Sequence, residues 1–365
     1  MSGAAPRFTV LLPTHDRADV LGFAVQSVLA QTEPDFELLV VADGCTDRTA
    51  EVLAGFPDPR LRVFDLPKAP HFGYANRNVA LREARGRLVA FAAHDDLLLP
   101  DHLARMGALL DGTRAAWGYS RPAWVSTDGV IVPFGVNLGF PDEMQAFRER
   151  RNTIPAACIV HTRRALEAAG FWPEDVPSAA DWVLWRRMLE ASGGRAAHLP
   201  VPTTLHFSAG WKRSRHAGSE DVRRLVAIAD SAAWWPAILR HPPDGEPEQA
   251  RLWSALETGG AAWVEALRDA LDAVLARIGW ASVHPPGPGD EPTLAALERL
   301  AAEHDAALTR LAAEHGSALA RLAADRNAAV AARDGAVAAL AALHASTSWR
   351  ITAPLRAAAR LFGRG

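Results

Sequence analysis

Residues 8–17 consist of the apolar run Phe8-Thr9-Val10-Leu11-Leu12 followed by Pro13-Thr14-His15-Asp16-Arg17. A short apolar run that stops at a proline is typical of a buried parallel strand. From Val20 to Leu29 apolar residues recur at helical spacing, and Phe36 to Val41 is a second apolar run. The chain from Thr9 to His102 therefore predicts strand, helix, strand, helix, strand, the order of an α/β sheet that binds a nucleotide.

Polar residues follow the predicted strands, at the sheet edge where ligands of α/β proteins bind. Asp43 comes at the end of the second strand, and its carboxylate can accept hydrogen bonds from a ribose hydroxyl or a base N–H. The alternative for Asp43-Gly44 is an ordinary turn, because both residue types favour turns. The third predicted strand, Arg87 to Ala93, ends in His94-Asp95-Asp96.

Two adjacent carboxylates at a strand end repel each other unless a cation or hydrogen-bond donors compensate their charge. Mg²⁺ or Mn²⁺ is the natural compensator, because these ions prefer carboxylates, water and phosphate oxygens. His94 is either a further ligand or a hydrogen-bonding wall residue. The alternative for Asp95 and Asp96 is a helix cap, although Asp101 beside Pro100 is better placed to cap the next helix.

These residues together resemble the inverting family 2 glycosyltransferases with the GT-A fold. The segment Thr9 to Thr49 is similar to that family's opening strand, helix and Asp-Gly-Ser-x-Asp-x-Thr loop, with Cys45 in place of the usual serine. Residues 73–78, Gly-Tyr-Ala-Asn-Arg-Asn, resemble the segment that presents an Arg-Asn pair toward the nucleotide. His94-Asp95-Asp96 stands where the family carries its metal motif. The similarity runs over roughly the first 210 residues with the motifs in order.

The resemblance implies a single α/β GT-A domain, the nucleotide-diphospho-sugar transferase fold, with a mostly parallel sheet. It also implies site roles: Pro13, Thr14, His15, Asp16 and Asp43 frame the base and ribose; Arg77 assists near the nucleotide; Asp95 contacts ribose or metal; and Asp96 coordinates Mn²⁺ or Mg²⁺. That metal would neutralise the departing diphosphate. Many members have an acid where Ala93 or His94 stands, so the site rests on Asp95 and Asp96.

An inverting transfer needs a base that deprotonates the acceptor hydroxyl. Ser178 to Arg187 resembles the family's Glu-Asp-x-x-Leu-Trp-x-Arg segment, in which Asp181 takes the place of the base and Ala180 replaces the neighbouring Glu. Trp182 and Trp185 flank Asp181 in sequence, so an apolar wall would raise the pKa of Asp181. The alternative is that Asp181 caps a helix.

Other residues of this region are candidates for binding the diphosphate or a sugar. The basic segment after Phe207 can close over a diphosphate, or it can be ordinary surface charge. The candidate residues of this diphosphate or acceptor loop are Trp211, Lys212, Arg213 and Arg215, of which the three basic side chains are the candidate anion contacts. Because aromatic faces match the C–H face of a pyranose, Trp117, Trp124 and Trp211 are candidate stacking platforms or else core residues.

The C-terminal third has a different composition. We expect a GT-A domain over residues 1–235, a helical extension over 236–282 and a Pro/Gly linker over 283–292. Leucine pairs then recur with a period of 11 residues, which predicts a long helix over residues 293–345. Such a leucine stripe needs a partner, so we expect homo-oligomerisation through a coiled coil; a solitary Ala-rich helix is the alternative.

The last segment, residues 346–365, predicts an amphipathic tail. It resembles a short C-terminal motif of polysaccharide-building glycosyltransferases and associated proteins. After Pro354, apolar Leu355 and Phe362 fall on one helical face, and Arg356 and Arg360 fall on another. That pattern fits contact with an anionic membrane surface or docking onto a partner protein.

Charge and composition limit the class of partner and the location. The chain has 39 Lys and Arg against 42 Asp and Glu, a formal net charge of −3, which argues against a nucleic-acid partner. Cys45 and Cys158 match no metal-ligand spacing. No signal peptide and no membrane-spanning run is visible, so we expect a cytoplasmic protein, peripheral at the inner membrane face if the tail binds lipid.

The predicted function is transfer of a sugar, with inversion, from a nucleoside diphosphate sugar to a hydroxyl of a cell-surface polysaccharide or lipid-linked acceptor. The alternative is a catalytically silent scaffold that binds nucleotide sugars and recruits partners through the coiled coil and tail. Ala93 and Ala180, where the family often has acids, motivate that alternative.

Overall fold

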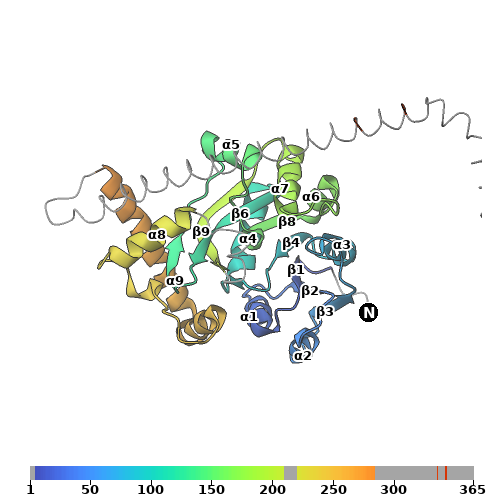
Figure 1. The fold of residues 1–365 in the computed structure, drawn as a ribbon, viewed down its shortest axis with the longest axis horizontal. Helices are drawn as coiled ribbons and strands as arrows, with labels where there is room; N and C mark the ends of the chain where they lie inside the picture. The colour runs from blue at the N-terminus through green and yellow to red at the C-terminus, as the bar shows by residue number, and fades with distance from the viewer. Residues whose placement is uncertain (1–4, 209–219, 284–334, 336–341, 343–365) are drawn as a thin grey trace, which may run out of the picture. The chain divides into compact units, whose positions relative to one another are not determined.

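The structure is a computed structural model that describes residues 5–208 and 220–283 and the single positions 335 and 342. The chain divides into two units, residues 1–294 and residues 295–365. An α/β sheet with helices on both faces forms the first unit (Figure 1). The predicted linker and coiled coil and the predicted tail fall almost entirely outside the described residues and stay predictions.

One sheet of nine strands runs through the described residues, with the order β3-β2-β1-β4-β8-β6-β9-β5 and with β7 paired to β6. The strands are β1 (Phe8–Thr14), β2 (Phe36–Asp43), β3 (Leu61–Leu66), β4 (Leu88–Phe91), β5 (Leu97–Leu98), β6 (Trp117–Val125), β7 (Ile131–Pro133), β8 (Ile159–Thr162) and β9 (Ala197–Phe207). β3, β2, β1 and β4 pair in parallel, so their carboxyl ends share one edge. Beyond β4 the sheet is mixed, since β8 is antiparallel to both β4 and β6.

Nine α-helices and two short 3₁₀ helices connect these strands within the described residues. They are α1 (Ala18–Leu29), α2 (Thr49–Ala54), α3 (Tyr74–Arg82), α4 (His102–Thr113), α5 (Pro141–Glu149), η1 (Ala156–Cys158), α6 (Arg163–Ala169), α7 (Ala180–Ala191), α8 (Glu220–Ser231), η3 (Ala237–Leu239) and α9 (Glu248–Val283). Over these described residues, no helix combines the length and apolar character that crossing a membrane requires.

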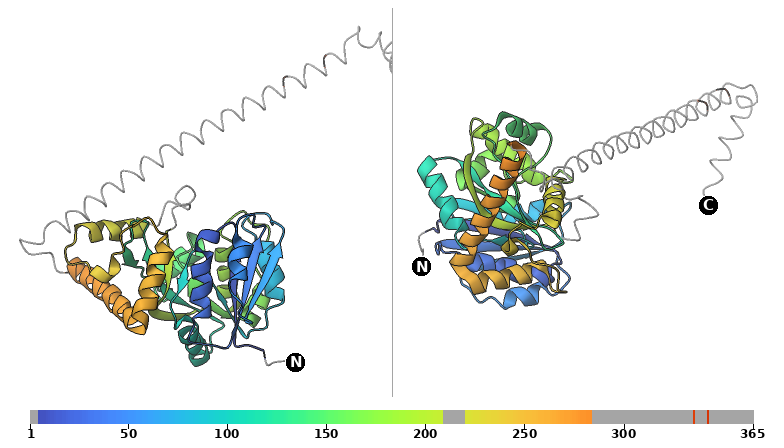
Figure 2. Two further views of the ribbon diagram at one scale, coloured as in Figure 1. Left: turned by 90° about the horizontal axis from the view of Figure 1, so that it is seen from below. Right: turned by 90° about the vertical axis from the view of Figure 1, so that its left-hand side faces the viewer.

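The two faces of the sheet are covered by different helices, as the side-chain alternation of β1 requires. Phe8, Val10 and Leu12 point to the face covered by α1, α2 and α4, where they pack with side chains such as Val25. Leu11 points to the other face, which is covered by α3, α6 and α7. Figure 2 shows the strands edge-on with α1 against one side of the sheet. The predicted α/β architecture is confirmed, and both faces of its parallel half are buried.

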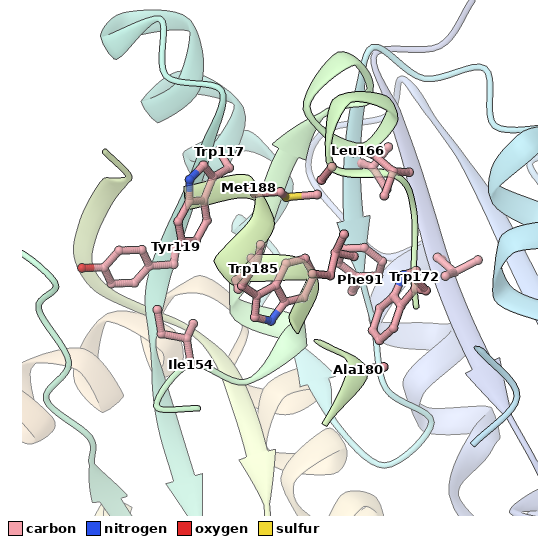
Figure 3. Packing of buried hydrophobic residues seen from close by; sticks show 14 of the residues in the cluster. Phe91, Trp117, Tyr119, Ile154, Leu166, Trp172, Ala180, Trp185 and Met188 are labelled. Carbon is pink, nitrogen blue, oxygen red and sulfur yellow. The ribbon is translucent and has the colours of Figure 1, made fainter. Parts of the chain in front are cut away.

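The core on the α7 side is built from large aromatic side chains (Figure 3). Trp185 lies with its ring centroid 5.2 Å from that of Phe91 and 5.8 Å from that of Trp172. Trp172 in turn stacks on Tyr74 at 5.8 Å. This cluster fixes the amino-terminal ends of α3 and α7 relative to the end of β4.

Three details differ from the sequence-based expectation. An additional parallel strand, β3, and helix α3 intervene between the second and third expected strands. Asp101 precedes α4, but its carboxylate makes no capping bond and instead accepts hydrogen bonds from Arg105 and Arg268. By the family resemblance, the sequence from Asn152 to Val160 predicts a strand that forms the floor of the acceptor site, but residues 152–158 form a loop and η1, and β8 starts only at Ile159.

Helix α9 covers the predicted helical extension and is broken in the middle. Gly260 has φ 55° and ψ −143°, outside the helical region, so the helix consists of two arms. Leu256 of the first arm and Leu267 and Leu271 of the second are buried. The helix packs against α1, β7 and η3, and residues 236–283 therefore contact the sheet domain directly.

Candidate active site

Asp16 joins the end of β1 to the loop that follows β2. Asp16 has φ 48°, a left-handed conformation that side chains with short polar groups tolerate best. Its Oδ1 accepts the backbone N–H of Thr46 at 2.6 Å, and this hydrogen bond lowers the pKa of Asp16. Thr14 is buried, Pro13 is partly exposed and His15 is exposed beside Asp16. These four predicted nucleotide-binding residues thus form one turn at the carboxyl edge of the sheet.

Asp43 ends β2 at the same edge and is almost fully buried. Its carboxylate pairs with the Lys68 ammonium and accepts the N–H of Ala69 at 2.8 Å and the side-chain N–H of Asn76 at 2.7 Å. Gly73 has φ 73°, and a Cβ there would overlap Asp43 Oδ2. Asp43 is therefore more than a turn residue, because it gathers the β3–α3 loop around its carboxylate.

Arg77 lies in the first turn of α3 between two aromatic rings. Its guanidinium carbon is 5.1 Å from the ring centroid of Tyr74 and 4.6 Å from that of Trp172, a cation–π sandwich. Burial lowers the pKa of Arg77, while the charges of Asp181 and Asp43 oppose that shift. Nε of Arg77 is buried and has no hydrogen-bond partner among the described residues. The charge of Arg77 therefore acts on both Asp43, a predicted nucleotide-binding residue, and Asp181, the predicted general base.

Asp181 lies in the first turn of α7, whose N-cap residue is Ala179 and not Asp181. Burial raises the pKa of Asp181, although Arg77 and Asn152 favour its charged form. The side-chain N–H of Asn152 donates to Asp181 Oδ2 at 2.8 Å, and Asn152 Oδ1 accepts the N–H of Ile154 at 3.0 Å. Because Ile154 fixes the orientation of the amide, Asn152 presents its donor side to Asp181.

Asp95 and Asp96 follow β4 and are both buried. Asp96 accepts His206 Nδ1 at 2.8 Å and the N–H of Phe207 at 3.2 Å, which fastens it to the end of β9. The ring of His206 stands edge-on to Trp124, with centroids 4.5 Å apart. The hydrogen bond from His206, a residue distant in the sequence, therefore compensates in part for the repulsion between Asp95 and Asp96.

The donor atoms near Asp96 fit a divalent cation of intermediate softness. Two carboxylates and one imidazole nitrogen suit Mn²⁺ better than Mg²⁺, which demands oxygen ligands. Asp95, Asp96 and His206 do not form a compact ligand set; within the described part of the chain, ligand atoms lying within 4.8 Å of one another occur in His15, Asp16 and Cys45.

That second set is better explained as a structural turn. Asp16 Oδ1 is engaged by the backbone of Thr46 and Asp47, and burial raises the pKa of Cys45, which favours the neutral thiol. By donor chemistry alone, Asp95, Asp96 and His206 suit a metal better than His15, Asp16 and Cys45, whereas by distance only the latter three have ligand atoms within 4.8 Å of one another among the described residues.

Residues 9–156 match the sequence model of the family described as Glycosyl transferase family 2. This region belongs to glycosyl transferase family 2. The predicted resemblance to family 2 is confirmed for this region, and with it the GT-A class of fold, since β1 to β4 and their helices lie inside the matched residues. The predicted tail motif stays a prediction.

Two curated relatives and one solved structure show how far the similarity extends. The succinoglycan biosynthesis protein ExoO of Rhizobium meliloti is 36% identical over 34% of this chain and 35% of its own length. The putative teichuronic acid biosynthesis glycosyltransferase TuaG of Bacillus subtilis is 29% identical over 52% of this chain and 75% of its own length. The crystal structure of S. aureus TarS 1–349 in complex with UDP-GlcNAc is 21% identical over 61% of this chain and 66% of that chain, with a TM-score of 0.47. The chain spans about a third of the length of ExoO.

Two described residues of the candidate site lie beyond the family 2 match. Asp181 and His206 lie beyond residue 156, and both contact residues inside or at the edge of the match. Sequence reasoning missed His206, Lys68 and the role of Asn152 as a partner of Asp181. No local pattern singles them out, because each is recognised only by the distant carboxylate that it binds.

The structure separates the three expected aromatic platforms. Trp117 is fully buried and donates its indole N–H to Ser192 Oγ at 3.2 Å, so it is a core residue and not a sugar platform. Trp124 is partly exposed and lies against His206, beside the candidate metal ligand. Trp211, Lys212, Arg213 and Arg215 fall outside the described residues and stay predictions.

Proposed function

We propose that this chain is a metal-dependent inverting glycosyltransferase that moves a sugar from a nucleoside diphosphate sugar to a hydroxyl acceptor, a cell-surface polysaccharide or lipid-linked glycan. The observation that carries this proposal is the position of Arg77, whose charge acts on both Asp43 and Asp181. Asp43 is suited to bind a base or ribose, and Asp181 is suited to deprotonate an acceptor. The charge of Arg77 links these two carboxylates.

The acceptor side depends on Asp181. A general base must stay deprotonated at the working pH and still attract a proton, which a carboxylate with a raised pKa does better than an ordinary one. Asn152 orients the carboxylate of Asp181, which would accept the proton of the attacking hydroxyl. As the new glycosidic bond forms at the anomeric carbon, its bond to the diphosphate breaks and the electron pair leaves with the diphosphate.

The donor side depends on the loop after β4. Asp95 and Asp96, with His206 as a third donor, would hold Mn²⁺ or Mg²⁺, and such an ion neutralises charge on the leaving diphosphate. The burial of both carboxylates directly after β4, at the edge of the sheet that also carries Asp43, supports this assignment. Pro13, Thr14, His15, Asp16 and Asp43 would frame the nucleotide, and the Nε–H of Arg77 is available as a further donor.

The test separates binding from turnover. UDP, GDP and dTDP sugars are titrated with Mn²⁺ by calorimetry, and nucleoside diphosphate release is followed with and without saccharide acceptors. We expect Asp181→Asn to bind the donor like the wild type and to lose at least about 10²-fold in turnover, the lower end of a general base contribution. We expect Asp96→Asn to lose metal-linked binding.

Two results would contradict the proposal. Unchanged turnover in Asp181→Asn would remove the assigned base. Donor binding without release of nucleoside diphosphate by the wild type, with every acceptor, would support the scaffold function instead. Oligomerisation, membrane contact and a cytoplasmic location belong to the same proposal, and light scattering and vesicle co-sedimentation of the full chain test the first two.

A further inference from the structure

Helix α9 holds both ends of the segment that carries the predicted metal ligands. Gln249 Nε2 donates to the backbone carbonyl of Asp95 at 3.0 Å. Further along the helix, Arg268 donates to both carboxylate oxygens of Asp101, at 2.7 and 2.9 Å. The segment 95–101 is thus anchored at its first and last residue by a helix outside the family 2 match.

The hydrogen bond from Gln249 to the carbonyl of Asp95 lies in the protein interior. Gln249 is 2% exposed, and its neighbour Leu252 is equally buried. A buried amide is costly unless it is hydrogen-bonded, and Gln249 directs its N–H at one carbonyl of the candidate site. The start of α9 is fixed locally as well, because Arg251 pairs with Asp244 at 2.8 Å.

Strand β9 holds the middle of the same segment. Leu97 and Leu98 pair with β9 in antiparallel register, and the N–H of Leu99 donates to Thr203 O at 2.9 Å. Asp96 is bonded to His206 and Phe207 at the end of that strand. Asp95 precedes Leu97 and Leu98, the two residues that pair with β9. The hydrogen bond from Gln249 therefore holds the backbone of this segment where the pairing with β9 has ended.

We infer that Gln249 is a positioning residue that sets the Asp95 backbone, and with it the Asp95 carboxylate, for metal-linked nucleotide binding. This inference rests on the proposed function. It assigns to α9 a part in the donor site, where sequence alone predicts a separate helical extension. Arg268 has the complementary role at Asp101, where it also donates to the backbone carbonyl of Pro202 at 3.0 Å and so ties α9 to β9.

The test uses Gln249→Met in the full chain, which removes the N–H donor at similar side-chain volume. We expect faster hydrogen exchange of the backbone amides of residues 95–97 and an increase of about tenfold in the Mn²⁺ concentration that half-saturates UDP or GDP binding, the low end of the effect of losing an outer-sphere partner. The control is Leu271→Ala, a fully buried position on the second arm of α9. It should lower the melting temperature and leave both readouts unchanged.

The outcomes separate this inference from the proposed function. Unchanged exchange and unchanged Mn²⁺ dependence in Gln249→Met would overturn it. Equal effects in Leu271→Ala would also overturn it, because helix stability alone would then explain them. If the wild type binds neither UDP nor GDP with Mn²⁺, the proposed function fails, while the exchange measurement still decides whether Gln249 holds the Asp95 backbone.

Discussion

Substituting Asn152 by Ala should move the acid limb of the pH–rate profile to higher pH. Asn152 donates to Asp181 at 2.8 Å, and this bond favours the charged carboxylate. A hydrogen bond to a charged group contributes about 1.5 kcal/mol at the lower end of its range, a value suited to a partly exposed site. Because about 1.4 kcal/mol corresponds to a factor of ten in an equilibrium, the pKa of Asp181 should rise in the variant and its deprotonated fraction at acidic pH should fall by about tenfold.

The assay is kcat/KM for transfer measured from acidic to mildly alkaline pH. Below the pKa of the base, Asn152→Ala should be about tenfold slower than the wild type, since the deprotonated fraction of Asp181 falls by that factor. Above it the two curves should converge, because Asp181 is deprotonated in both. Asn137→Ala is the matched control, as Asn137 Oδ1 accepts the N–H of Gly139 at 2.9 Å in a similar loop turn. A loss of rate by the same factor at every pH would refute the reasoning.

Two further predictions concern stability. Because burial raises the pKa of Asp181, its stabilising proton is present below the ordinary value of 3.8 and is lost as pH rises through the folded-state pKa. Asp181→Asn should therefore raise the melting temperature at pH 7 by about 2 °C, and calorimetry should show this gap narrowing toward pH 4; a constant gap would contradict the assignment. Gly73→Ala should lower the free energy of unfolding by about 2 kcal/mol, because a left-handed φ and contact with Asp43 both penalise a Cβ. Gly112→Ala, with open space around it, is the control in denaturant titrations, and equal effects would contradict the strain argument.

The parallel half of the sheet could be predicted because its strands are buried on both faces. β1, β2 and β4 are continuous apolar runs that end in polar residues, so their sequence reports both the strand and its ligand edge. β3 is the outer neighbour of β2 and is only partly buried, so Leu61–Leu66 has no such run and was not predicted. The irregular loop before β8 also lacks a continuous apolar run, so its structure could not be predicted either.

The candidate site could be predicted only in part, for a similar reason. Asp43, Arg77 and Asp181 stand in recognisable local motifs, and the structure connects them electrostatically. His206 and Gln249 carry no local signal, because each binds a partner more than 100 residues away, Asp96 or the backbone of Asp95. Such contacts are set by how β5, β9 and α9 pack, and a single sequence does not specify that packing directly.

The border at β4, where the strand pairing changes from parallel to antiparallel, has a consequence for how the site can vary. β4 is the last strand of the parallel half and meets antiparallel β8 on its other side. Asp16, Asp43 and Arg77 precede this border, Asp95 and Asp96 follow β4 directly, and Asn152, Asp181 and His206 come later in the chain. A substitution beyond this border can therefore alter the surroundings of Asp181 while the parallel strands that position Asp43 stay unchanged.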